Sequence, residues 1–161
     1  MNRDQVKVII EKVLKDLGTK YADPKAIDLV FNTGLVESRY EYLMQTGTGP
    51  ARSFWQVEPA TAVSQCENFI AKRYSLVQSC VDVSYVDEEH WMYPDINHWD
   101  KILTSSIAAG IIHCRLKFWR VPKPLPDTLA QQAKQWKRYY NAGGKGTENK
   151  YIQMVEHYAG E

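Results

Sequence analysis

The sequence IAAGIIHCRLKFW, residues 107–119, is the most continuously apolar part of the chain, and it decides the fold class. Between Ile107 and Ile112 the apolar residues surround the whole helical circumference instead of marking one face. A helix of this kind belongs in the interior of a domain. We therefore expect a single helix from Trp99 to Trp119 to run through the middle of a mainly α protein.

Apolar residues at helical spacing also occur on both sides of this segment in the chain. From Arg3 to Leu17 apolar side chains recur every three or four positions, and Gly18 follows as a stop. The pair Asp23-Pro24 is typical of a helix start, with a cap followed by proline in the first turn. We expect helices over residues 3–17, 24 to between 37 and 43, 59–77, 99–119, 128–140 (capped by Asp127) and 148–158, joined by a Gly-rich loop or short hairpin at 45–53 and an acidic loop with at most one helical turn at 82–100.

The composition of the 161 residues is that of one globular domain, with 44% hydrophobic and 24% charged positions. A chain of this length buries roughly two-thirds of its unfolded surface, so disorder is excluded and no disulfide or metal is needed for folding. Because 20 Lys and Arg residues face 19 Asp and Glu residues, there is no overall basic footprint for nucleic acid. The longest apolar run is too short to cross a membrane. We expect one domain over residues 1–161, a monomer that binds no nucleic acid and does not insert into a membrane.

The cysteines and histidines indicate neither a disulfide framework nor a metal centre. Cys66, Cys80 and Cys114 are an odd number without metal-binding spacing, which favours synthesis in a reducing compartment. The histidines stand at no ligand spacing from a cysteine or an acid pair, so we expect no metal and no cofactor. Charged residues spaced through the first helix exclude a secretory signal peptide at this end.

Glu37 is the first candidate for chemistry. It lies near the C-terminal end of a strongly apolar helix, just before the Gly-rich loop. The negative end of the helix dipole disfavours a charged carboxyl there, and partial burial would raise its pKa further, as a general acid requires. A surface carboxylate at a fraying helix end is the alternative interpretation.

Two further polar positions stand out beside aromatic residues. The Gln56 amide lies in the segment Phe-Trp-Gln-Val and could bind a neutral sugar group or satisfy backbone groups of the loop. Tyr140, followed by Asn141, could orient a carboxyl across a cleft, or the pair could simply end a helix. Both alternatives stay open for each position.

In their order along the chain, these pieces resemble the soluble lytic transglycosylase family, which shares the lysozyme-like fold with goose-type lysozymes. The resemblance covers about residues 25–158 and rests on several short motifs at plausible spacing. In sequence order they are Glu37-Ser38, a Thr/Gly-rich loop, Gln56 followed by Pro59-Ala60-Thr61-Ala62, a central helix from Ala109 to Trp119, and Tyr140-Asn141-Ala142-Gly143. The resemblance implies an α+β lysozyme-like domain, mainly helical, with a small loop or hairpin lining a glycan-binding cleft.

The resemblance also implies a set of site residues. Glu37 matches the catalytic acid, Gln56 the substrate-contacting Gln, and Tyr140 the hydroxyl near the catalytic carboxyl. Asn141 matches its neighbour in the family motif, and Thr46 stands where the family has a loop Ser. The chain departs from the family pattern where Ser53-Phe54-Trp55 replaces Gly-Leu-Met and where Pro50 is an extra loop residue.

The implied reaction is cleavage of the β-1,4 bond between N-acetylmuramic acid and N-acetylglucosamine in peptidoglycan. Goose-type enzymes have aspartates at positions where this chain has Pro50 and Thr61. A single carboxylate suits a lytic transglycosylase, which forms 1,6-anhydro ends through the acetamido group of the substrate. The alternatives are a muramidase that uses Glu58 or Glu41 with water, and a non-catalytic virion or wall-binding protein of the same fold.

The expected setting follows from the missing signal peptide and the small size. We expect a bacteriophage lysin made in the host cytoplasm that reaches periplasmic peptidoglycan through a holin or as part of the virion. Residues 115–138 hold a local excess of basic side chains. This segment is either a solvated surface or a site of attraction to anionic cell-wall or outer-membrane polymers.

Overall fold

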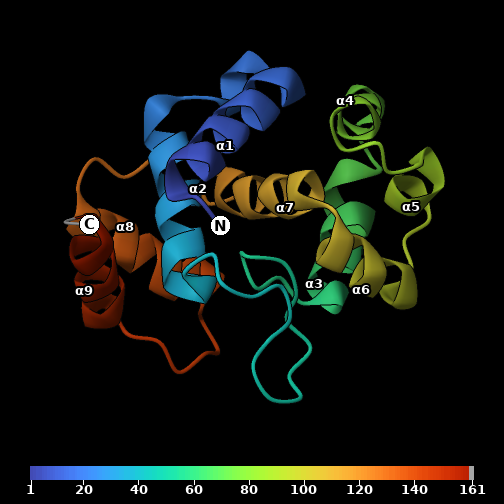
Figure 1. Cartoon of the computed structure of the whole chain (residues 1–161). Coiled ribbons are helices and arrows are strands. Elements are labelled where there is room, and N and C mark those ends of the chain that lie inside the picture. Colours follow the sequence, from blue (N-terminus) through green and yellow to red (C-terminus); the bar gives the residue numbers. More distant parts are fainter. Residues whose placement is uncertain (160–161) are drawn as a thin grey trace.

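Helix α7 (Ile107–Trp119) passes through the middle of the protein, and the other helices pack around it (Figure 1). The computed structural model describes residues 1–159. From Ala109 to Phe118 every residue of α7 except Lys117 is buried. The mainly helical class and the central position predicted for the apolar segment 107–119 are therefore confirmed, because only the interior of a protein hides so much of the circumference of a helix.

The remaining helices form two groups on either side of α7 (Figure 1). Helices α1, α2, α8 and α9 pack together on one side, and α3 to α6 gather on the other. Between residues 1 and 159 the only β pairing consists of isolated bridges in the Gly-rich loop, from Met44 to Arg52 and from Arg52 to Val57. The helical elements are α1 (Arg3–Leu17), η1 (Thr19–Tyr21), α2 (Pro24–Ser38), α3 (Pro59–Gln65), the π-helical turn η2 (Cys66–Ile70), α4 (Tyr74–Ser84), α5 (Glu88–Met92), α6 (Ile96–Ser105), α8 (Leu129–Gln135), the π-helical turn η3 (Trp136–Tyr140) and α9 (Glu148–Ala159).

The prediction of one helix from Trp99 to Trp119 is wrong, because the chain breaks at Ser106. This residue is extended, with φ −111° and ψ 107°, so α6 ends before it and α7 begins after it. The Ser106 hydroxyl accepts a hydrogen bond from the Ala109 backbone N–H at 3.1 Å. A serine that caps the next helix in this way competes with continuation of the helix before it.

The acidic segment 82–100 is also more helical than expected. It contains α5 and the start of α6, and Asp95 caps α6 by accepting the His98 backbone N–H at 3.1 Å. Acidic residues favour helix N-termini, where they face the positive end of the dipole. Trp91 and Trp99 anchor the two helices, since both indoles are fully buried and in contact with His113 on α7.

Two other predicted boundaries need correction. The expected helix 59–77 is interrupted after η2, and α4 starts only at Tyr74. The cap of α8 is Thr128 and not Asp127, because Thr128 forms a reciprocal capping box with Gln131. The Asp127 carboxylate forms an ion pair with Lys25 instead.

The end of α2 is held in place by an unusual turn. Arg39 and Tyr40 both adopt left-handed backbone conformations, with φ 55° and 59°. The Tyr40 side chain is almost fully buried, and its hydroxyl donates to the Phe31 carbonyl oxygen at 2.9 Å. Gly34 leaves the room that this ring needs, since a Cβ there would lie 2.2 Å from the Tyr40 hydroxyl oxygen. The turn therefore fixes the last turn of α2, which carries Glu37.

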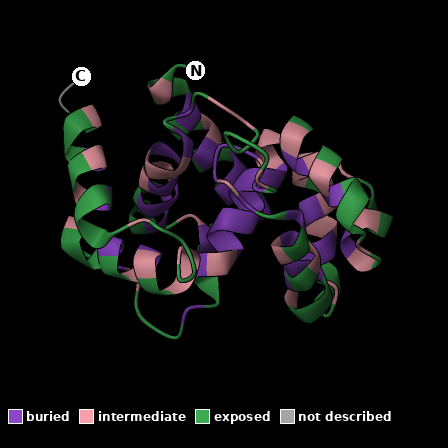
Figure 2. Cartoon of the chain, turned by 90° about the horizontal axis from the view of Figure 1, so that it is seen from below, coloured by how far each residue is buried: buried purple, intermediate pink, exposed green. Residues whose placement is uncertain are grey.

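The distribution of buried residues reflects the packing of two groups of helices against α7. Buried residues concentrate along α7 and on the faces of the other helices that point toward it, while α9 and the outer turns are largely exposed (Figure 2). Within residues 1–159, no helix is long and apolar enough to span a bilayer.

Candidate active site

A groove of about 730 Å³ lies where the end of α2, the Gly-rich loop, α7 and the segment after η3 meet. Five polar residues singled out from the sequence all line it, although the first and the last of them are more than a hundred positions apart in the chain. They are Glu37, Thr46, Gln56, Tyr140 and Asn141. The structure thus brings the whole predicted set together in one place.

Glu37 is partly buried in this groove, and burial raises the pKa of its carboxyl to about 7. The Lys117 ammonium opposes this rise because it favours the carboxylate. The buried Trp136 indole N–H also lowers the pKa of Glu37, although it is too far from any acceptor to form a regular hydrogen bond. The carboxyl is therefore close to half protonated near neutral pH and can both give and take a proton.

The Gly-rich loop that faces Glu37 is anchored by Arg52. Its guanidinium forms an ion pair with Asp100 at 2.6 Å and donates to the carbonyl oxygens of Gly49 and Ala51. Because these contacts and the two β bridges share one residue, the loop has a defined shape despite its glycines. Arg52 was not singled out from the sequence, since nothing near it indicates a partner 48 positions away.

The loop packs directly on the central helix at Gly110. A Cβ there would lie 3.0 Å from side-chain atoms of Ser53 and Trp55, so any larger residue would have to push these side chains away by a few tenths of an ångström. The Trp55 indole N–H donates to the Val30 carbonyl oxygen at 2.9 Å, which ties the loop to α2 as well. These contacts fix the wall of the groove that carries Gln56.

Gln56 has a left-handed backbone, with φ 49°, and lines the groove. Its side-chain N–H group donates to the Ser53 carbonyl oxygen at 2.9 Å. Within residues 1–159 its amide oxygen accepts no hydrogen bond. The interpretation that Gln56 satisfies a backbone group of the loop is therefore confirmed, while binding of a sugar group stays a prediction that the amide oxygen leaves open.

Tyr140 lies at the end of η3, with its ring stacked on Phe118 at 5.3 Å between centroids. Its hydroxyl donates to the Trp55 carbonyl oxygen at 2.5 Å and does not donate to Glu37. The hydroxyl thus ties the C-terminal segment to the loop. Asn141 follows in the groove and accepts from Lys137 through its carbonyl oxygen at 3.1 Å, whereas Thr46 is exposed on the loop.

Lys117 is the main groove residue that sequence reasoning missed. Between Ala109 and Phe118 it is the one residue of α7 that is not fully buried, and its ammonium donates to the Tyr140 carbonyl oxygen at 3.3 Å. The ammonium also lies over the Tyr140 ring, 4.6 Å from its centroid. Burial lowers the pKa of Lys117, while the carboxylates of Glu37 and Glu58 oppose that fall. The sequence signal that could have singled out Lys117 is a lysine inside an otherwise apolar helix.

The two carboxylates considered as possible partners of Glu37 lie in different places. Glu58 is exposed and lines the groove at the start of α3. Glu41 lies outside the groove, in a separate hollow near the N-terminus, and pairs with Arg39 at 3.7 Å. Of these two, only Glu58 could take part in chemistry beside Glu37.

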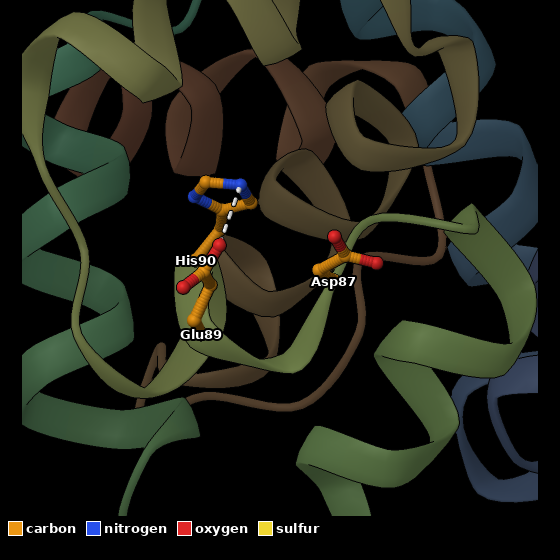
Figure 3. A group of neighbouring side chains, drawn as sticks. All are labelled: Asp87, Glu89 and His90. Carbon is orange, nitrogen blue, oxygen red and sulfur yellow. Dashed lines mark ion pairs between the residues drawn. The ribbon is translucent and has the colours of Figure 1, made fainter.

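One group of described side chains has the donor types for a metal ion, and it lies outside the groove. Asp87, Glu89 and His90, at the start of α5, offer ligand atoms within 4.8 Å of one another (Figure 3). The His90 imidazole is 3.8 Å from the Glu89 carboxylate, which is 71% exposed. Exposed acidic groups often cluster in this way without an ion, so the group carries no metal assignment.

The three cysteine thiols are free and buried. Burial raises the pKa of each thiol, which keeps it protonated and unreactive. Cys114 is next to the groove on α7, but an inert thiol of this kind does not act as a nucleophile.

The groove as a whole combines a carboxyl of raised pKa, a nearby ammonium and several uncharged hydrogen-bonding groups. No family model, no curated protein and no solved structure matches the chain.

Proposed function

We propose that the protein is a lytic transglycosylase that cleaves the β-1,4 bond between N-acetylmuramic acid and N-acetylglucosamine in peptidoglycan. The observation that carries this proposal is Glu37, whose carboxyl has a pKa of about 7 in a groove that also contains Gln56 and Tyr140. A glycosidic bond is broken by an acid that is protonated at working pH and reaches the leaving oxygen.

In the first step, the Glu37 carboxylic acid gives its proton to the glycosidic oxygen. The bond from C1 of the muramoyl unit to that oxygen breaks, and its electron pair leaves with the oxygen as a sugar hydroxyl. The acetamido oxygen of the muramoyl unit bonds to C1 and carries the developing positive charge. No second carboxylate is needed at this stage.

In the second step, the Glu37 carboxylate takes the proton of the muramoyl 6-hydroxyl. The freed oxygen bonds to C1 and displaces the acetamido oxygen, so the 1,6-anhydro ring closes without water. A hydroxyl on the same sugar is already close to C1 and competes well with solvent. Lys117 favours the ionised form of Glu37 between the two steps.

A lysozyme-like arrangement is part of this proposal. The two groups of helices on either side of α7 and the bridged loop that lines the groove support it. We assign the loop at 45–57 to one wall of the glycan cleft and the segment after Tyr140 to the other. Within the groove, the free amide oxygen of Gln56 is suited to accept from a sugar hydroxyl or an acetamido N–H.

A muramidase is the second candidate, and the position of Glu58 is the observation that favours it. Its exposed carboxylate lines the same groove and could position a water molecule for attack at C1. The product would then carry a reducing muramic acid end. A non-catalytic wall-binding protein of the same fold is the remaining alternative.

Mass spectrometry of digested peptidoglycan separates these proposals. We expect the unaltered protein to release muropeptides with anhydro ends, which are lighter by one water and resist borohydride reduction. Glu37→Gln should abolish release while circular dichroism stays unchanged. Glu41→Gln is the matched control, because it removes a carboxylate four positions away that lies outside the groove.

The outcomes are distinct. Reducible ends as the sole product, lost in Glu58→Gln, would establish the muramidase. Binding to sacculi without release of any fragment by the unaltered protein would favour the wall-binding protein. Full activity of Glu37→Gln would contradict both enzymatic proposals.

A further inference from the structure

A second hollow, of about 260 Å³, lies where the start of α2 and the end of α7 come close to each other. It shares no lining residue with the groove. Three cationic side chains line it, from Lys20, Arg115 and Lys123, together with the single carboxylate of Asp23. This hollow includes part of the basic segment 115–138 that the proposed reaction does not use.

Arg115 is the buried centre of this hollow. Its side chain is only 2% exposed, and its Nε donates to the Tyr21 carbonyl oxygen at 2.9 Å. Its Nη1 atom is buried without a hydrogen-bond partner, and within residues 1–159 no carboxylate pairs with it. A buried guanidinium with unsatisfied donors is costly unless something accepts from it.

The Trp119 ring holds the cations in place around this centre. The Arg115 guanidinium lies 5.4 Å from the centroid of that ring, and the Lys20 ammonium lies 5.6 Å from it. Neither Lys20 nor Lys123 forms an ion pair with a described carboxylate. Asp23 is already used as the cap of α2, where its carboxylate accepts the Lys25 backbone N–H at 2.8 Å. The hollow therefore has an excess of positive charge that the chain leaves unbalanced.

The positive surface continues into a neighbouring hollow of about 370 Å³. The two hollows share Lys123, Leu125 and Gln135, and the second adds Lys134 and Arg138. Its one acid, Asp127, is paired with Lys25. A ligand that fills the first hollow with an anionic group thus has room for its remainder along a basic path.

We propose that the hollow around Arg115 is a binding site for a phosphate monoester, with Lys20 and Lys123 completing the positive shell. Arginine donors match phosphate oxygens in number and direction, and a doubly charged phosphate suits three cations better than a carboxylate does. The remainder of the phosphorylated molecule lies toward Lys134 and Arg138. This site does not depend on the reaction proposed for the groove.

Calorimetric titration at low ionic strength tests the site, with inorganic phosphate and glucose 1-phosphate as probes. We expect saturable binding of both, and a melting temperature that rises with phosphate concentration. Lys20→Gln with Lys123→Gln should weaken binding about tenfold, because two charge-assisted contacts are lost. Lys12→Gln with Lys72→Gln removes the same charge from exposed positions elsewhere and should change the affinity less than about twofold.

Arg115 itself is tested by Arg115→Lys, which keeps the charge and loses the planar fork, and we expect it to abolish detectable binding. If that variant does not fold, the paired lysine variants decide the outcome alone. Equal weakening by the two lysine pairs would overturn the proposal, since only net charge would then matter. Binding to phosphatidic acid vesicles without binding to either soluble probe would overturn it as well, because a charged surface would then be the ligand.

Discussion

Replacing Glu37 with glutamine should make the protein more stable at alkaline pH while removing the proposed lytic activity. The carboxyl has an ordinary pKa of 4.5, which burial raises to about 7 in the folded protein. One pKa unit corresponds to about 1.4 kcal/mol, so keeping this group in its folded environment costs about 3 kcal/mol once it is ionised.

The direction of the pH dependence follows from which state holds the proton. Below pH 4.5 the carboxyl is protonated in both states and costs nothing. As the pH rises toward 7, the unfolded chain releases the proton and the folded protein retains it, so the free energy of unfolding falls. Above the folded pKa the loss is complete. Glu37→Gln has no such group and should not show this fall.

Urea unfolding of both proteins at pH 4.5 and pH 8.5 measures the effect. The difference in free energy of unfolding between variant and unaltered protein should increase by about 3 kcal/mol from the acidic to the alkaline pH. In thermal melts the same gap is about 6–12 °C for a chain of this size. Every other titrating group is common to both proteins and cancels. A gap that stays the same at the two pH values would refute the burial of Glu37.

Three further predictions concern the surroundings of that carboxyl. Lys117→Met should raise the Glu37 pKa and move the alkaline fall of lytic activity upward by about one pH unit, whereas Lys117→Arg should leave the pH profile unchanged. Identical pH profiles for the unaltered protein and both variants would exclude an electrostatic role of Lys117. Tyr140→Phe should lower turnover about ten- to a thousandfold. It should also lower the free energy of unfolding in urea by about 1 kcal/mol. A loss of stability with full specific activity would mean that the hydroxyl is only structural. Gly34→Ala should destabilise the protein by about 2 kcal/mol or more, because the added Cβ meets the Tyr40 ring, and an unchanged urea midpoint would contradict this packing.

The sequence predicts the groove residues well because most of them stand where helices stop. Glu37 precedes the left-handed turn that ends α2, and Tyr140 ends η3. Such boundaries leave local signals, namely glycines, caps and changes in periodicity. Lys117 leaves none of these, because the side of α7 that meets the groove is decided by elements far away in the chain.

The errors in the predicted helix boundaries also arise from contacts between segments that lie far apart in the chain. Ser106 stands directly before the apolar run that begins at Ile107, and whether its hydroxyl caps a new helix depends on how α6 packs against α3. The acidic segment has the composition of a loop, yet two buried indoles, those of Trp91 and Trp99, give it a core to fold against. Local composition cannot report these distant contacts.

The buried thiols provide internal reporters of partial opening. Cys66 and Cys80 lie on the side of α7 that holds α3 to α6, while Cys114 lies on α7 itself. A thiol reagent modifies such residues only when the surrounding structure opens, so the labelling rate measures the free energy of that opening. Faster labelling of Cys66 and Cys80 than of Cys114 would identify the side of α7 that holds α3 to α6 as a separate cooperative unit, which opens while the central helix stays folded.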